Sequence, residues 1–190
     1  LCEGHAGGLL RTFIILLRGV MPTGKNRVPM AQLREVMAAA GYGRVRTWIA
    51  SGNLLVDTRE SAPETAARVR ALIKQEIGPD LAVIARSAEE VTRVLADNPF
   101  EEGAGHDPAR VFYAFFETRP GDDKLAALKQ RDFGDNKLII TDSAAYMYIP
   151  GDYTKAKLNA AVLEKATGVA ITMRNGNTLN KLVEMANERA

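Results

Sequence analysis

The feature that most constrains the fold is an order of predicted strands and helices that occurs twice. From about residue 12 the apolar pattern predicts strand, helix, two strands, helix, strand and a further helix, and this order starts again near residue 111. The last strand and trailing helix recur 88 residues later, from Ser87 to Asn175. Each half is therefore β-α-β-β-α-β, the ferredoxin-like order, followed by one helix. We predict an α+β protein of two ferredoxin-like halves related by internal duplication, each with a trailing helix.

The predicted halves span residues 11–97 and 110–190, and a linker loop at 98–109 is rich in Gly, Pro and acidic residues. Residues 1–10 are predicted to be a disordered extension or an expression remnant, because they lack periodicity. In each half, two helices are expected to cover one face of an antiparallel sheet. The other face must be covered by the partner half, by the trailing helices or by a ligand.

The element boundaries follow from apolar runs and capping residues. The predicted strands cover residues 12–18, 45–50, 53–57, 81–85, 111–116, 137–141, 145–149 and 169–173. The predicted helices begin near Pro29, Ser61, Ser87, Asp122, Lys157 and Asn175. Capping boxes at Ser61–Glu64 and Ser87–Glu90 support two of these starts.

Composition excludes several classes of protein. The single cysteine, Cys2, cannot form an internal disulfide, which fits a reducing cytosol. No apolar run approaches the roughly 20 residues that a membrane-spanning helix needs. The two histidines, His5 and His106, belong to no metal-ligand spacing. We therefore expect a cytoplasmic protein with no membrane partner, no metal and no cofactor.

The charge is unevenly distributed along the chain. Residues 9–50 carry seven basic side chains and one acidic side chain, a net charge of +6, whereas residues 51–150 carry 12 basic and 17 acidic side chains, a net charge of −5. This asymmetry permits a local field that attracts an anionic partner. The alternative is that these charges spread over several faces and cancel with their neighbours.

The stretch "RGVMPTGKN", residues 18–26, resembles a phosphate-binding P-loop. It has Gly19, four residues and then Gly24-Lys25, but Asn26 occupies the position of the Mg²⁺-binding Ser or Thr. Pro29 delays the predicted helix start by several residues, and the following strands form a hairpin instead of a parallel crossover. We predict that this is not a P-loop. Its glycines and cations leave two interpretations open, an anion site or a solvated connection.

A second stretch, residues 172–182, also indicates an anion site. Arg174 and the cap residue Asn175 match Arg86 and Ser87 of the first half, but Thr178 stands where the first half has Glu90. The last helix therefore has no carboxylate at its positive end. We interpret this end as open to a phosphate or a carboxylate, although both stretches are also explained as ordinary helix starts.

Three motifs resemble those of the bacterial family catalogued as domain of unknown function 1697. They are "LLRGVMPTGKNRVPMAQLR", "TWIASGNLLVD" and "KLNAAVLEKATGVAITMRNGNTLNKLVEM", and the resemblance covers about residues 11–186. It implies an α+β fold of two ferredoxin-like halves, and it implies no established activity.

We expect a non-catalytic binder of an anionic ligand, either a phosphorylated small molecule or a nucleic acid. The alternatives are a small-molecule enzyme that uses the same site and a protein-interaction module built on Trp48 and the aromatic residues of the second half. No catalytic residue is predicted. If the two basic stretches meet, they form one ligand site with the following residues: Arg18, Lys25, Asn53, Arg174, Asn175, Thr178 and Lys181.

Overall fold

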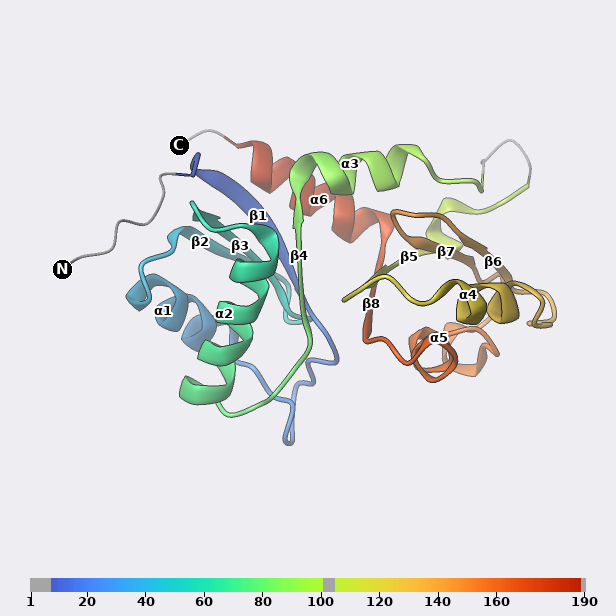
Figure 1. The fold of residues 1–190 in the computed structure, drawn as a ribbon, viewed down its shortest axis with the longest axis horizontal. Coiled ribbons are helices and arrows are strands. Elements are labelled where there is room, and N and C mark those ends of the chain that lie inside the picture. Colours follow the sequence, from blue (N-terminus) through green and yellow to red (C-terminus); the bar gives the residue numbers. More distant parts are fainter. Residues whose placement is uncertain (1–7, 101–104, 189–190) are drawn as a thin grey trace. The chain divides into compact units, whose positions relative to one another are not determined.

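The computed structural model describes residues 8–100 and 105–188 and divides into two compact units, Leu1–Ala88 and Glu89–Ala190 (Figure 1). Part of the predicted extension at 1–10 and part of the predicted linker at 98–109 lie outside the described residues. Gly8 is held by Arg59, whose guanidinium donates a hydrogen bond to its carbonyl oxygen at 2.8 Å.

The first unit is one ferredoxin-like module. Its elements are β1 (Arg11–Leu17), α1 (Met30–Ala39), β2 (Gly43–Trp48), β3 (Asn53–Thr58), α2 (Ala62–Glu76) and β4 (Val83–Ser87). The strand order is β2-β3-β1-β4, and every pair is antiparallel. The predicted capping box at the start of α2 is present: Ser61 accepts from the Glu64 amide, and Glu64 accepts from the Ser61 amide.

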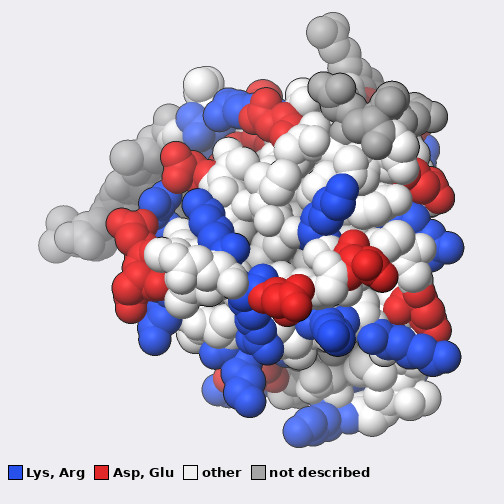
Figure 2. All heavy atoms as spheres, turned by 90° about the vertical axis from the view of Figure 1, so that its right-hand side faces the viewer, with Lys and Arg blue, Asp and Glu red and all other residues white. Residues whose placement is uncertain are grey.

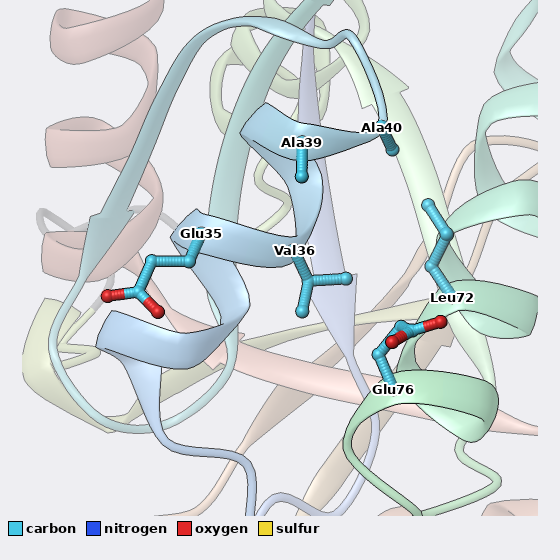
Figure 3. Close-up of a pocket in the computed structure, with 6 residues that line it drawn as sticks. All are labelled: Glu35, Val36, Ala39, Ala40, Leu72 and Glu76. Carbon is cyan, nitrogen blue, oxygen red and sulfur yellow. The ribbon is translucent and has the colours of Figure 1, made fainter.

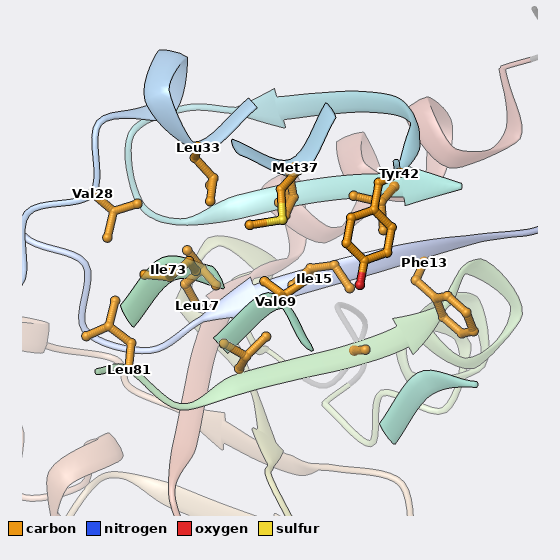
Figure 4. Close-up of a cluster of buried hydrophobic side chains, with 14 residues drawn as sticks. Phe13, Ile15, Leu17, Val28, Leu33, Met37, Tyr42, Val69, Ile73 and Leu81 are labelled. Carbon is orange, nitrogen blue, oxygen red and sulfur yellow. The ribbon is translucent and has the colours of Figure 1, made fainter. Parts of the chain in front are cut away.

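Helices α1 and α2 cover one face of the first sheet. Alternate residues of the strands face these helices, as the period of two requires, among them Phe13, Ile15 and Leu17 of β1 (Figure 4). They pack against Leu33 and Met37 of α1 and against α2. Burial of such side chains supplies the main free energy that holds the two layers together.

The second unit repeats the module. Its elements are α3 (Ala88–Ala96, which starts at the boundary), η2 (Pro108–Arg110), β5 (Val111–Phe116), α4 (Asp122–Lys129), β6 (Lys137–Ile140), β7 (Ala145–Tyr148), η3 (Tyr153–Lys155), α5 (Ala160–Thr167), β8 (Ile171–Asn175) and α6 (Gly176–Asn187). The strand order β6-β7-β5-β8 matches that of the first unit. The predicted fold of duplicated ferredoxin-like halves is therefore confirmed.

Both faces of the second sheet carry helices. Ala114, Met147 and Ile171 pack with the cores of α4 and α5. Residues of the opposite face contact the trailing helices, because the Tyr146 hydroxyl donates to the Val94 carbonyl of α3 at 3.0 Å and α6 packs on β5 and β8. The aromatic residues that the sequence offered as an interaction surface are largely core here: Tyr146 and Phe115 are fully buried.

The duplication extends to side chains. Arg86 pairs with Ile14 of β1 in register, and Arg174 pairs with Tyr113 of β5. Each guanidinium donates a hydrogen bond at 2.8 Å to the carbonyl oxygen of the residue before it. The two arginines therefore occupy equivalent positions in the two units.

Several boundaries differ from those predicted. Strand β2 ends at Trp48, not at residue 50, because Ile49 turns the chain with φ +48°. Helix α5 begins at Ala160, not near Lys157, because Asn159 caps it by accepting from the Val162 amide. Strands β4 and β8 each begin two residues later than predicted, as their pairing with β1 and β5 sets.

Chain order predicts that α3 belongs to the first half, but its contacts group it with the second unit. The described residues contain no helix that is both long and apolar enough to cross a membrane.

Candidate functional site

The basic stretch after β1 is a small, internally bonded loop at residues 18–29. The Met21 amide donates to the Asn26 carbonyl at 3.1 Å, and the Arg27 amide donates to the Gly24 carbonyl at 3.2 Å. The Asn26 side chain reaches back to the Gly19 carbonyl at 3.4 Å. The residue that departs from the P-loop pattern thus helps to close the loop.

Two cations project from this loop. Lys25 and Arg27 are exposed, and neither side chain makes a hydrogen bond or an ion pair with any residue that the structure describes. Residues 18–29 contain no Asp or Glu that would neutralise them. The loop therefore presents uncompensated positive charge.

Helix α1 begins directly after the loop without a side-chain cap. Its N-cap residue is Pro29, and its first turn contains no acidic residue. The first hydrogen bond of the helix runs from the Leu33 amide to the Pro29 carbonyl, so the amides of Met30, Ala31 and Gln32 have no partner within the helix. These N–H groups lie at the positive end of the helix dipole.

The position of α1 also decides the P-loop question. The helix begins at Met30, five residues after Lys25, and β1 is antiparallel to both of its neighbours. A P-loop helix begins at the Gly-Lys pair and follows a strand of a parallel sheet. The prediction that this loop is not a P-loop is confirmed.

The turn between β2 and β3 packs against the loop. The Leu17 amide donates to the Gly52 carbonyl at 2.9 Å. A Cβ atom on Gly52, which has φ +84°, would lie only 2.7 Å from Val20 and 2.8 Å from Leu17. Glycine is therefore required where the turn meets the loop.

Asn53 is fully buried under this turn. Its amide nitrogen donates to the Trp48 carbonyl and to the Ser51 hydroxyl, both at 3.0 Å. These bonds give Asn53 a structural task that the sequence does not reveal. Its predicted contact with a ligand stays a prediction.

Arg18 is the first residue of the loop and directly follows β1. Its backbone amide donates to the Ala82 carbonyl at 3.0 Å, and its side chain is half-buried. Of the predicted ligand residues in the first unit, Lys25 is therefore the one whose side chain is exposed.

In the second unit, the predicted residues gather at the junction of β8 and α6. The Arg174 guanidinium donates to the Thr172 hydroxyl at 2.7 Å and to the Met173 carbonyl at 2.8 Å. Burial lowers the pKa of Arg174 to about 10, so the side chain keeps its charge at neutral pH.

The start of α6 is capped, but only by a neutral group. Asn175 accepts a hydrogen bond from the Thr178 amide at 2.9 Å, and the first turn contains no acidic residue, as predicted. Lys181 pairs with Glu184 of the same helix at 2.7 Å. In contrast to α1, this helix end satisfies one of its own amides with a side chain.

The predicted residues Arg174, Asn175, Thr178 and Lys181 lie close together along the chain, whereas α1 and β2 separate Asn53 from Arg18 and Lys25. The sequence interpretation named α6 as the open helix end and left Arg27 and the start of α1 out of the site. The sequence itself indicates an uncapped start of α1, because "VPMAQLR" has no Ser, Thr, Asp or Asn cap before Met30 and no acid in the first turn. The described residues contain no cluster of three or more His, Cys, Asp or Glu side chains that would hold a metal ion.

Comparison with known proteins places the chain in a family. The sequence profile of a protein family of unknown function, DUF1697, matches residues 10–146, and the chain belongs to this family. Among solved structures, the conserved bacterial protein SP0830 from Streptococcus pneumoniae is similar, with a TM-score of 0.73 and 21% identity over 94% of this chain and 100% of that chain. This similarity shows the shared fold. No curated protein matches the chain.

Proposed function

We propose that this protein is a non-catalytic binder of an anionic ligand and that its site is the loop at residues 18–29 together with the start of α1. One observation carries the proposal. Lys25 and Arg27 are unpaired among the described residues, and they directly precede a helix end whose first three amides lack a cap. Exposed amides at a helix start bind phosphate or carboxylate groups, and adjacent cations add charge-assisted hydrogen bonds.

The expected ligand carries a phosphate group, as a phosphorylated small molecule or as part of a nucleic acid. A broad nucleic-acid platform needs a continuous basic surface. On the face drawn in Figure 2, basic side chains are interspersed with acidic ones. The loop at residues 18–29 presents two exposed cations, Lys25 and Arg27, which suits a small phosphorylated molecule better than an extended nucleic acid.

The predicted ligand residues of the second unit lie at the start of α6. Arg174, Asn175, Thr178 and Lys181 have internal partners, but α6 still lacks a carboxylate at its start. We propose them as an anion contact of the second unit by itself. A Thr178→Glu substitution would place a carboxylate there and should weaken binding if this helix end takes part.

A protein-interaction module is the second candidate, and a specific observation favours it. Met21 is 54% exposed and Ile49 is 52% exposed, in the loop and turn that pack together through Gly52. Ile49 also has φ +48°, which is strained for a β-branched residue. A contact with a partner protein would explain why an apolar side chain is kept there. A small-molecule enzyme that uses the same site is the third candidate, and no residue of the site is assigned a catalytic role. The proposal includes a cytoplasmic location, which rests on the single cysteine.

The proposal is tested by a thermal-shift screen of the whole protein against pyrophosphate, nucleotides, phosphorylated sugars, and short RNA and DNA. A ligand that binds the native state raises the melting temperature. The Lys25→Ala/Arg27→Ala variant should lose the shift, because each charged contact contributes about 1.5–3 kcal/mol of binding when it is well formed. Lys124→Ala/Lys129→Ala is the matched control, since it removes two exposed cations of α4.

The two kinds of ligand give different results. A shift with small phosphates that the control variant retains supports the proposed site on the loop. A shift confined to oligonucleotides and abolished by moderate salt identifies a nucleic acid instead. Equal shifts in both double variants would refute the site.

A further inference from the structure

A groove runs between α1 and α2 of the first unit, on the outer side of the helix layer. It has a volume of about 470 Å³ and is lined by Glu35, Val36, Ala39, Ala40, Leu72 and Glu76 (Figure 3). This volume is within the range of small-molecule sites, about 300–1,000 Å³. Four of the six residues are aliphatic, so the floor suits an apolar group.

The two ends of the groove differ in charge. At the Ala40 end, the Arg68 guanidinium donates to the Ala40 carbonyl and to the Glu60 carboxylate, both at 2.6 Å. This cation is therefore already neutralised. At the other end, the Glu76 carboxylate lies beside Leu72 (Figure 3).

The Glu76 carboxylate has no structural partner in the part of the chain that the structure describes. Gln32 donates to the backbone carbonyl of Glu76 at 3.3 Å, which leaves the side chain available. Neither Glu76 nor Glu35 forms an ion pair or a side-chain hydrogen bond with any of the described residues. An apolar floor next to an uncompensated negative charge is complementary to a ligand with an apolar body and a cationic end.

We propose that this groove binds a small organic cation of that kind, an aliphatic primary amine, with its chain on Val36, Ala39 and Leu72 and its ammonium group at Glu76. The site is separate from the proposed anion site and does not depend on it. Because Glu76 is exposed, water weakens its attraction, and the affinity is expected in the millimolar range with a preference for the amine of roughly two- to fivefold.

The test uses three ligands that share one chain length and differ in head group: hexylamine, 1-hexanol and hexanoate. Each is titrated into the whole protein, and the methyl NMR signals of Val36 and Leu72 report binding in the groove. The methyl signals of Leu163 in α5 serve as the reference for nonspecific effects. Glu76→Gln removes the charge at the groove, and Glu184→Gln makes the same change on α6.

The expected order of affinity is hexylamine, then 1-hexanol, then hexanoate. Glu76→Gln should reduce the preference for the amine over the alcohol, and Glu184→Gln should leave that preference unchanged. Ala39→Gln should weaken all three ligands by covering the floor. The proposal is overturned if the three ligands bind equally, if the preference for the amine is undiminished in Glu76→Gln, or if the Val36 and Leu72 signals do not move.

Discussion

At the residue scale, two candidate ligand residues from the motif stretches have opposite surroundings. Asn53 and Lys25 both belong to motif stretches, but Asn53 is fully buried with two internal acceptors, whereas Lys25 projects into solvent. The sequence identified both as candidates because residue type and motif membership carry no information on burial. The start of α1 is different, because Pro29 at the N-cap position cannot provide a capping side chain. The absence of a side-chain cap could therefore be predicted from the sequence alone.

Gly52 provides a test at this scale. Gly52→Ala should lower the free energy of unfolding by about 2–4 kcal/mol, because the new Cβ meets Val20 and Leu17 and the residue has a left-handed φ of +84°. Gly24→Ala is the matched control: its φ is +80°, but nothing lies within 4 Å of the new Cβ, so about 1 kcal/mol is expected. Urea denaturation measures both. Equal losses would show that the contact between turn and loop is looser than described.

At the element scale, the start of a helix relative to a motif decides what the motif does. Helix α1 begins five residues after Lys25, so its amides cannot surround a triphosphate in the P-loop manner. We expect ATP to bind no more tightly with Mg²⁺ than without it, because Asn26 lacks the hydroxyl that ligates the metal. Equilibrium titration under both conditions checks this. A gain in affinity with Mg²⁺ that disappears in Lys25→Ala would contradict it.

Tyr42 links the end of α1 to α2. Its hydroxyl donates to Glu60 at 2.8 Å, and the Arg68 guanidinium lies over its ring at 5.0 Å. Burial, and then the hydrogen bond and charge of Glu60, raise the pKa of Tyr42 far above its ordinary value of 10.0.

Because the pKa of Tyr42 is raised in the folded state, Tyr42 stabilises the fold fully at pH values below its unfolded pKa. This stabilisation is lost as the pH rises above the unfolded pKa. The free energy of unfolding should therefore fall as the pH increases beyond 10. Tyr42→Phe should be less stable at pH 8, and its stability should decline less steeply between pH 9 and 11. Denaturation at a series of pH values measures the two slopes. Parallel slopes would show that Tyr42 does not titrate differently on folding.

At the scale of the whole molecule, the duplication made most of the fold predictable. The repeated order of elements and the equivalence of Ser87 with Asn175 were enough to predict the two ferredoxin-like sheets, because strand and helix periods are local properties of the sequence. The grouping of α3 with the second unit was not predictable, since it depends on long-range contacts such as that between Tyr146 and Val94.

The two units differ in charge. Leu1–Ala88 contains 12 basic and 7 acidic residues, a net charge of +5, and the remainder of the chain contains 13 and 16, a net charge of −3. The first unit is therefore the one whose field attracts an anion, in agreement with the proposed site on its loop. The sequence indicated this asymmetry but could not show which cations are unpaired.

The most direct test of the proposed anion site is a backbone amide NMR titration of the whole protein with inorganic pyrophosphate at low salt. We predict saturable shifts that are largest for the amides of Met30, Ala31 and Gln32. In Lys25→Ala/Arg27→Ala these shifts should require at least about tenfold more pyrophosphate. The account is contradicted if these amides do not respond, or if the largest shifts occur at the start of α6, around Gly176, and are unchanged in the double variant.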